Sequence, residues 1–271
     1  PVSINFLLSD NEPVNLIGSS HTDYIVHGRR FRVTAGAFFH PNIPQVEHMV
    51  DAVLERLNLT GSEAVLDLYA GVGTLTAFMA ERAALVTSVE SYPPAVTDAD
   101  ENLADLDNVD LIEGGVESVL PELDERYDAA AVDPPPSGMD GRALDALAAI
   151  GPRTLVYVSA DPASLARDGK RLAQTGYRLV DVQPLDMAPQ QRLAAGETQL
   201  FDAMGDEEPG QPADLLEAEQ RGLGQELVAR VEDRLRHAIR AAEVAAIGDR
   251  DAQVMQPAAA RIGEEPDRCD G

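Results

Sequence analysis

A chain of 271 residues with 44% hydrophobic residues can bury a substantial core, so we expect one large soluble domain with appendages. The net charge of −26, from 47 acidic and 21 basic residues, opposes the electrostatic attraction that supplies most nonspecific nucleic-acid binding. The single cysteine, Cys269, excludes an internal disulfide framework and a cysteine-based zinc site.

The start of the chain and the length of its apolar runs indicate where in the cell the protein is expected. No run approaches the roughly 18 apolar residues of a membrane span, and the opening Pro-Val-Ser-Ile-Asn lacks the features of a secretory signal. We therefore expect a cytoplasmic protein with no membrane partner. Because the first residue is Pro1, we also expect the chain to be processed or to be part of a longer polypeptide.

The first residues predict short extended pieces separated by turns, which we assign to a β-rich segment over residues 1–43. Gly18 and Gly28 mark turns between the strand-like runs. These runs cover residues 2–8, 13–17, 24–27 and 31–34. From residue 44 the pattern changes to the i, i+3, i+4, i+7 spacing of an amphipathic helix. Its apolar positions are Val46, Met49, Val50, Val53, Leu54 and Leu57.

Strand-like and helix-like segments then alternate along the chain. The predicted strands are 64–68, 85–90, 109–113, 128–133 and 153–159, and the predicted helices are 74–83, 94–106, 117–123, 141–150 and 163–175. Such alternation produces a parallel sheet with right-handed crossovers, helices on both faces and ligands at the carboxyl ends of the strands. The last predicted strands, 177–183 and 198–203, have no helix between them, so we expect an antiparallel pair and seven strands in all.

The segment 63–74, Glu-Ala-Val-Leu-Asp-Leu-Tyr-Ala-Gly-Val-Gly-Thr, leads from a strand through a glycine-rich turn into a helix. Gly71 and Gly73 let the backbone approach a ligand closely, and Asp67 at the carboxyl end of the strand suits a cationic ligand. The dinucleotide fingerprint G-x-G-x-x-G needs a third glycine where this chain has Thr76. S-adenosylmethionine therefore fits better than NAD, and the predicted α/β domain over residues 44–204 matches the class I methyltransferase fold, which is Rossmann-like.

Two further acids end predicted strands. Glu90 ends the second strand, where a carboxylate can accept hydrogen bonds from the ribose hydroxyls of the cofactor. Asp133 ends the fourth strand and begins Asp-Pro-Pro-Pro, whose prolines stiffen the mouth of the site. In nucleobase methyltransferases an acid or amide before Pro-Pro lies beside the methyl group and the target base. An ordinary exposed acid at a strand end has the same sequence pattern, so both assignments are hypotheses.

Residues 205–271 predict an acidic linker, an amphipathic helix and a disordered end. The linker begins Gly-Asp-Glu-Glu-Pro-Gly-Gln-Pro, and the helix covers about 214–247. Its apolar stripe comprises Leu223, Leu227, Val231, Leu235 and Ile239. A stripe of this kind must be covered, so we expect it to pack on the core domain or, alternatively, to bind a protein partner or form a dimer.

Five sequence pieces carry a family resemblance. They are Ala-Phe-Phe-His-Pro-Asn (37–42), Val-Leu-Asp-Leu-Tyr-Ala-Gly-Val-Gly-Thr (65–74), Val-Asp-Pro-Pro (132–135), Leu-Val-Tyr-Val-Ser-Ala-Asp-Pro-Ala-Ser-Leu-Ala-Arg-Asp (155–168) and Pro-Leu-Asp-Met-Ala-Pro-Gln (184–190). In this order they resemble the uracil-C5 RNA methyltransferases, which make 5-methyluridine in tRNA and 23S rRNA. The resemblance spans residues about 15–202 and implies an S-adenosylmethionine cofactor and an RNA partner, rRNA or tRNA, with no role for DNA.

The resemblance also implies roles for single residues. His40 occupies the position of a family glutamine that contacts the cofactor, although a hydrogen-bonded loop histidine is the simpler interpretation. Arg167 and Lys170 can contact phosphate or form salt bridges with Asp168 and its neighbours.

One departure from the family concerns the reaction itself. Methylating C5 of uracil needs a thiolate that adds to C6 and a base that removes the C5 proton. The family places this cysteine in Tyr-Val-Ser-Cys-Asn-Pro, whereas this chain has Ala160 in Tyr-Val-Ser-Ala-Asp-Pro. Glu197 lies two positions beyond the place of the family's general base. No catalytic residue is therefore assigned beyond Asp133 as a possible substrate contact.

Three hypotheses follow. The chain is an RNA methyltransferase of the uracil-C5 type that has lost its nucleophile, or a methyltransferase acting on a nitrogen that is already nucleophilic, or a non-catalytic module that binds S-adenosylmethionine or RNA. The second needs no thiolate, and the acidic tail supplies a handle for partners in the third.

Overall fold

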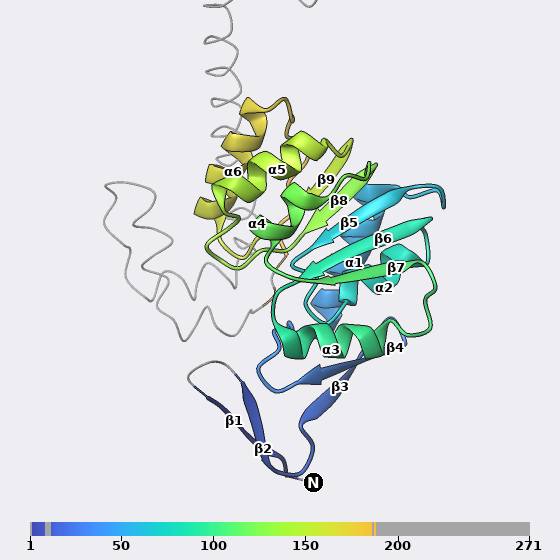
Figure 1. Ribbon diagram of the computed structural model, residues 1–271, viewed down its shortest axis with the longest axis vertical. Helices are drawn as coiled ribbons and strands as arrows, with labels where there is room; N and C mark the ends of the chain where they lie inside the picture. Colours follow the sequence, from blue (N-terminus) through green and yellow to red (C-terminus); the bar gives the residue numbers. More distant parts are fainter. Residues whose placement is uncertain (1, 9–11, 186, 188–271) are drawn as a thin grey trace, which may run out of the picture.

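A five-stranded parallel sheet forms the centre of the protein in a computed structural model that describes residues 2–8, 12–185 and 187 (Figure 1). Its strands lie in the order β7-β6-β5-β8-β9. They are β5 (Ala64–Leu68), β6 (Leu85–Glu90), β7 (Val109–Glu113), β8 (Ala129–Val132) and β9 (Thr154–Tyr157). The chain order reverses direction across the sheet beside β5, which places the crevice of a doubly wound fold at the ends of β5, β6 and β8.

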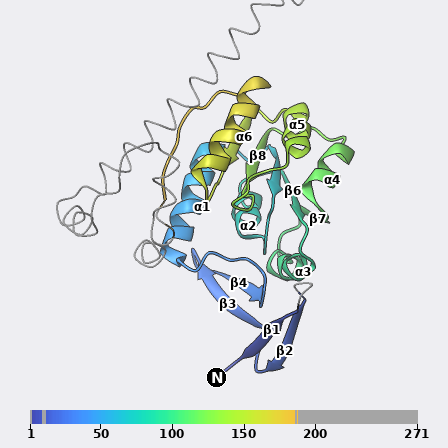
Figure 2. The same cartoon turned by 90° about the vertical axis from the view of Figure 1, so that its left-hand side faces the viewer.

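Helices cover both faces of the sheet (Figures 1 and 2). One layer contains α1 (Ile43–Leu57), α2 (Thr74–Ala80) and α3 (Pro93–Asn102), and the other contains α4 (Val116–Val119), α5 (Gly141–Ile150) and α6 (Pro162–Gln174). Val65 points into the first layer, while Leu66 and Leu68 point into the second. Because alternate residues are buried on opposite faces, β5 is apolar almost throughout. No helix in the described part of the chain is long and apolar enough to cross a bilayer.

The α/β alternation predicted from the sequence is confirmed, with corrections at two places. The predicted helix over 117–123 is α4 followed by a 3-10 turn, η1 (Leu120–Glu122), because Pro121 removes a helical hydrogen-bond donor. Residues 177–183 form no strand, so the described residues contain five strands in this sheet. Side chains hold that segment instead, as Arg56 of α1 donates to Asp181 at 2.6 Å and to Gln183 at 2.7 Å. Residues 198–203 lie outside the described residues.

The β-rich start is confirmed as two antiparallel hairpins. These are β1 (Ile4–Leu7) with β2 (Pro13–Ile17), and β3 (His21–Val26) with β4 (Arg29–Thr34). The second hairpin is part of the main core, because Val26 and Phe31 are fully buried against the residues of α1 and α2. The first hairpin lies apart from the central sheet (Figure 2).

Helix α3 anchors the second hairpin through buried polar groups. Asp98 is fully buried and accepts hydrogen bonds from the backbone N–H of Thr34 at 2.5 Å and from its hydroxyl at 2.8 Å. Arg32 lies 3.3 Å from the same carboxylate. Asn102 is also buried and donates to the carbonyls of Arg32 and Val72, each at 3.0 Å. These contacts join the hairpin to the loop that precedes α2.

The substitution Asp98→Asn is expected to destabilise the fold by about 3 kcal/mol, because it removes the buried charge opposite Arg32 and weakens the bonds from Thr34. Urea unfolding measures this loss. The matched control is Asp100→Asn, an exposed acid on the same helix that is expected to change stability by less than about 0.5 kcal/mol. Equal effects of the two substitutions would contradict the anchoring role of Asp98.

Candidate cofactor and substrate site

The carboxyl edge of the sheet brings three predicted acids into one neighbourhood. Asp67 is in β5, Glu90 ends β6 and Asp133 follows β8. The strands are parallel and in register, with Leu68 beside both Val89 and Val132. The N–H of Asp133 donates to the carbonyl of Leu68 at 3.2 Å, which fixes the start of the Asp-Pro-Pro loop against β5. Three residues predicted separately therefore share one edge.

The turn after β5 relies on left-handed backbone. Tyr69, Gly71 and Gly73 have φ angles of 63°, 57° and 83°. A Cβ added at Gly71 would find only the carbonyl oxygen of Phe38 within 4 Å, at 3.9 Å, so the turn leaves space beside this residue. A Cβ at Gly73 would instead lie 2.8 Å from the side chain of Leu103. Gly71 thus borders open space for a ligand, whereas Gly73 permits close packing at the start of α2.

Glu90 orders the turn as well as offering a ligand contact. One carboxylate oxygen accepts the N–H of Gly71 at 2.8 Å, and the other accepts those of Ser91 at 2.8 Å and Tyr92 at 2.7 Å. An ionised carboxylate has about four acceptor positions, so three backbone bonds leave about one for a ligand. The geometry fits a single ribose hydroxyl more readily than the pair that the sequence suggested.

Asp67 lies buried beneath the turn and is not exposed at its surface. Its side chain is buried, and the hydroxyl of Thr76 donates to it at 2.6 Å while lying 2.9 Å from the hydroxyl of Ser88. Burial raises the pKa of Asp67 to about 7, the Thr76 bond opposes that rise, and the charges of Asp133 and Glu90 add to it. Thr76, which ruled out the dinucleotide fingerprint, therefore has a positive role as the partner of Asp67.

The raised pKa predicts a pH-dependent stability. The folded pKa lies above that of the unfolded chain, so the folded state binds the proton more tightly and loses stability as the pH rises from about 4 to about 7. Asp67→Asn removes this loss while keeping an oxygen for Thr76. The difference in melting temperature between Asp67→Asn and the wild type is therefore expected to increase by a few degrees from pH 5 to pH 8. The conversion is roughly 2–4 °C per kcal/mol for a protein of this size.

Thermal scans across that range measure the difference, with the exposed Asp100→Asn as control. A difference that stays constant with pH would contradict the raised pKa of Asp67.

Asp133 and His40 meet across the mouth of the site. The Nε2 atom of His40 lies 3.6 Å from a carboxylate oxygen of Asp133, and the two side chains are 20% and 23% exposed. This distance exceeds a hydrogen bond, and Nε2 is buried without any hydrogen-bond partner in the described part of the chain. The ring of Phe38 packs edge-on against His40 at 4.8 Å. A polar group of a ligand placed beside this pair, at hydrogen-bond distance from both atoms, would satisfy both.

A buried acid that the sequence did not single out shapes the proline loop. Asp168 accepts the hydroxyl of Tyr157 at 2.6 Å and the N–H of Met139 at 2.8 Å. Arg167 pairs with the same carboxylate at 2.7 Å and donates to the carbonyl of Ser137 at 2.7 Å. Burial, followed by the Asp168 bond, raises the pKa of Tyr157. The salt-bridge interpretation of Arg167 is therefore confirmed, and the loop after Asp133 is fixed to α6.

Ala160 lies in the connection between β9 and α6 and is exposed. The neighbouring Ser159 donates its hydroxyl to the carbonyl of Asp161 at 2.9 Å, and Asp161 caps α6 by accepting the N–H of Ser164 at 2.7 Å. These bonds serve the turn, and within the described residues Ser159 has no hydrogen bond to a basic side chain. Cys269 and Glu197 lie outside the described residues. In the described part, no group of three or more acids, histidines or cysteines is arranged to hold a metal.

A parallel sheet with helices on both faces has the architecture of the class I methyltransferase fold. In this chain a glycine turn and three acids lie at the carboxyl edge of the neighbouring strands β6, β5 and β8. A model of the tRNA (uracil-5-)-methyltransferase family matches residues 21–189. The match covers more than half of the chain, so the protein belongs to this family, which confirms the resemblance drawn from its motifs.

Individual relatives agree. An uncharacterized RNA methyltransferase of Caldanaerobacter subterraneus subsp. tengcongensis is 36% identical over 188 residues, 68% of this chain and 42% of that protein. One of Clostridium tetani is 41% identical over 170 residues, 61% of this chain and 37% of that protein. The crystal structure of Pyrococcus abyssi tRNA (uracil-54, C5)-methyltransferase in complex with S-adenosyl-L-homocysteine is similar with a TM-score of 0.55 and 28% identity, over 64% of this chain and 42% of that one. The chain thus spans less than half the length of these relatives.

Proposed function

We propose that this chain binds S-adenosylmethionine at the carboxyl edge of the sheet and acts as an RNA methyltransferase domain in the cytoplasm. The assignment of the cofactor site rests mainly on the open turn at Gly71, which has a left-handed backbone and lies beside the Glu90 carboxylate. Family membership and the similar S-adenosyl-L-homocysteine complex support the same assignment. The cofactor would supply an electrophilic methyl group on a sulfonium.

Each acid has a separate proposed task. Glu90 uses its remaining acceptor position for a ribose hydroxyl. The buried Asp67 has a pKa of about 7, and a cationic ligand above it would favour its ionised form. Asp133 and His40 lie at the mouth, where they would orient the group to be methylated. Gly71 and Gly73 let the turn take its shape.

Glu90→Gln is expected to weaken S-adenosylmethionine binding by roughly tenfold or more, because the amide replaces a charged acceptor and sets an NH₂ group against backbone donors. Isothermal titration measures the affinity. Glu113→Gln is the control, since Glu113 ends the neighbouring strand β7 in register with Glu90 but is exposed. Equal affinities in wild type and Glu90→Gln would contradict the assigned site.

The nucleophile is the part of the site that departs from the family pattern. An alanine side chain cannot add to C6 of uracil, so the thiolate route is closed at Ala160. A second candidate function is therefore methyl transfer to a nitrogen that is already nucleophilic. The specific observation in its favour is the His40–Asp133 pair, which can accept a proton or a hydrogen bond from such a nitrogen. A non-catalytic binding module is the remaining alternative.

Methyl transfer from radiolabelled S-adenosylmethionine to RNA separates these functions when the labelled nucleoside is identified by mass. A methylated nitrogen supports the second candidate, and 5-methyluridine supports the family reaction through another residue. If the protein binds the cofactor but the RNA carries no label, the result supports the non-catalytic binding module.

The variant Ala160→Cys tests whether the uridine pocket survives. If it does, the restored thiolate is expected to add to 5-fluorouridine in RNA and give a covalent complex that resists denaturing electrophoresis, while the wild type gives none. Ser159→Cys is the positional control, because its hydroxyl is turned to the carbonyl of Asp161. A lack of trapping by Ala160→Cys, with cofactor affinity intact, would contradict a uridine pocket.

We further propose that the chain has three parts. Residues 1–43 are the β-rich start, residues 44–204 are the methyltransferase domain, and residues 205–271 are the acidic extension. The helix predicted in the extension serves as a contact for the core domain, for a protein partner or for a second copy of the chain.

A further inference from the structure

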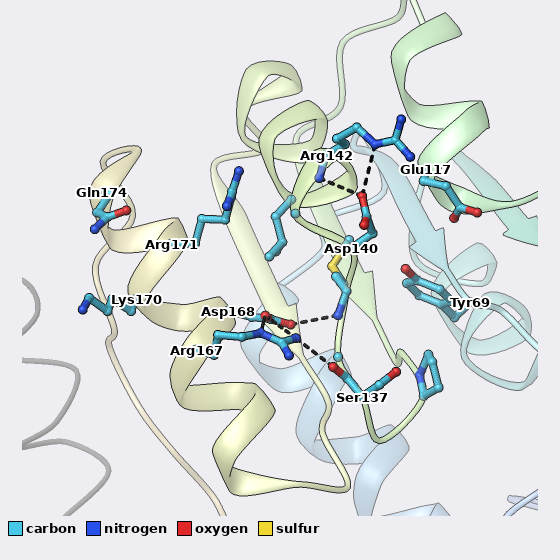
Figure 3. A pocket seen from close by; sticks show the side chains of 15 residues that line it. Tyr69, Glu117, Ser137, Asp140, Arg142, Arg167, Asp168, Lys170, Arg171 and Gln174 are labelled. Atoms are coloured by element: carbon cyan, nitrogen blue, oxygen red, sulfur yellow. Dashed lines mark hydrogen bonds and ion pairs between the residues drawn. The ribbon is translucent and has the colours of Figure 1, made fainter.

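A cavity of about 820 Å³ with charged side chains in its walls lies on the α4, α5 and α6 side of the sheet (Figure 3). Its walls are the proline loop, the first turn of α5 and the exposed side of α6. Tyr69 and Pro135 also line it, and each lies two residues from a proposed site residue, Gly71 and Asp133 respectively. The cavity therefore adjoins the proposed methylation site through the turn after β5 and the loop after β8.

Four basic residues line this cavity beside three acids, Glu117, Asp140 and Asp168, in a chain with only 21 basic residues and a net charge of −26. The cavity therefore has a small excess of positive charge on a strongly acidic protein. The four basic residues are Arg142, Arg167, Lys170 and Arg171, and Lys170 is the only lysine of the chain. Figure 3 shows Arg142 at the start of α5 and the other three along α6, with Arg167 turned toward Ser137 and Lys170 turned away from the proline loop. A basic row on a strongly acidic protein is where a polyanion would meet the least repulsion.

Two of the four basic side chains are bound to other residues of the cavity wall or its surroundings. Arg167 is bound to Asp168 and to the carbonyl of Ser137. Arg171 forms a bidentate salt bridge with Asp145, with hydrogen bonds of 2.8 and 2.6 Å. This salt bridge raises the pKa of Arg171. Both residues keep the walls in place and contribute positive charge without moving.

The other two are available to a ligand. The side chain of Arg142 is 86% exposed and has a single loose ion pair, 3.6 Å from Asp140. That aspartate is occupied in capping α5, where it accepts the N–H of Arg142 at 2.9 Å. Lys170 is exposed and lies within 4.0 Å of no carboxylate in the described part of the chain. Charged groups of this kind hold phosphate oxygens without first breaking an internal pair.

Tyr69 adds a flat aromatic surface to the charged row. Its left-handed backbone, with φ of 63°, turns it out of the strand, and Figure 3 shows its ring facing the loop. Burial raises the pKa of Tyr69 to about 12, and the charges of Glu117, Asp140 and Asp168 add to the effect. The phenol therefore stays neutral near pH 7 and adds no repulsion. Aromatic rings beside basic side chains are the combination that holds single-stranded RNA.

We propose that this cavity binds the phosphodiester backbone of the RNA next to the nucleotide that enters the methylation site, with Arg142 and Lys170 as the phosphate contacts. The inference rests on the proposed function and adds to it a place and two residues for the RNA. It explains how a chain with a net charge of −26 holds a polyanion, since contact is made locally.

The test compares two double variants of the full chain that remove equal charge. Arg142→Ala with Lys170→Ala alters the cavity, while Arg82→Ala with Arg126→Ala removes exposed arginines that precede β6 and β8, at the opposite edge of the sheet. Fluorescence anisotropy measures binding of a labelled RNA stem-loop with uridines in its loop, at several salt concentrations. Isothermal titration of S-adenosylmethionine checks that each variant retains its cofactor affinity.

The cavity variant is expected to bind the RNA at least tenfold more weakly, and the slope of log affinity against log salt is expected to flatten by about 0.7–0.9 for each lost phosphate contact. The control variant is expected to stay within about twofold of the wild type, because nonspecific attraction at these distances is largely screened. Similar losses in the two variants would overturn the proposal, as would RNA binding that neither variant affects.

Two further results separate the related possibilities. Inorganic phosphate that binds the cavity of the wild type while RNA does not would make it a small-anion site and overturn the proposal. RNA binding lost in the cavity variant, from a wild type that transfers no methyl group, would support the cavity and reject the enzymatic function. The two hypotheses can therefore fail independently.

Discussion

The convergence of like charges at one edge of a parallel sheet is the constraint on which the site depends. Parallel strands in register end together, so Asp67, Glu90 and Asp133 are brought close without any contact between them that offsets their repulsion. The fold supplies a hydrogen-bonding compensation for two of them. Thr76 donates to Asp67, and three backbone N–H groups donate to Glu90, while His40 lies 3.6 Å from Asp133, beyond a hydrogen bond. A bound cation would relieve the same repulsion, which gives the site a physical preference for a positively charged ligand.

The glycine turn is coupled to the first residues of the chain through α3. Asn102 joins the carbonyl of Val72 in the turn to Arg32 in β4, and Asp98 holds Thr34 from the same helix. Phe38 and His40 follow this hairpin and reach the mouth of the site. The β-rich start therefore contributes to the site as well as to the core. Its anchoring by buried polar groups fixes the direction in which the chain leaves β4.

The two halves of the site differ in how closely they follow the family pattern. The proposed cofactor half has the glycine turn and strand-end acids, while Ala160 occupies the position at which we expect the family's nucleophile, and Ser159 is hydrogen-bonded within a turn. His40 and Asp133 lie 3.6 Å apart, so these two side chains are the polar groups that a substrate would encounter in the proposed site. On the far side of the proline loop, basic residues line a cavity beside Tyr69. Chemistry and RNA contact are thus assigned to different sides of the loop that Asp168 holds.

The sequence by itself determined the α/β alternation, the glycine turn and the acids at the ends of β5, β6 and β8, because these depend on local periodicity and on where strands stop. It also contains Ala160 within a local motif, and the loss of the family's nucleophile at this position stays a prediction. It could not predict that residues 177–183 bind α1 through side chains instead of forming a strand, because their extended pattern is the same in both cases.

Only the tertiary structure decided which of these residues meet. The pairing of His40 with Asp133 joins positions far apart in the chain, and the burial of Asp67 and Asp168 follows from helices packing over them. The same packing places basic residues of α5 and α6 around one cavity. Contacts, burial and the pKa values they set depend on neighbours that are distant in sequence, and no local pattern contains that information.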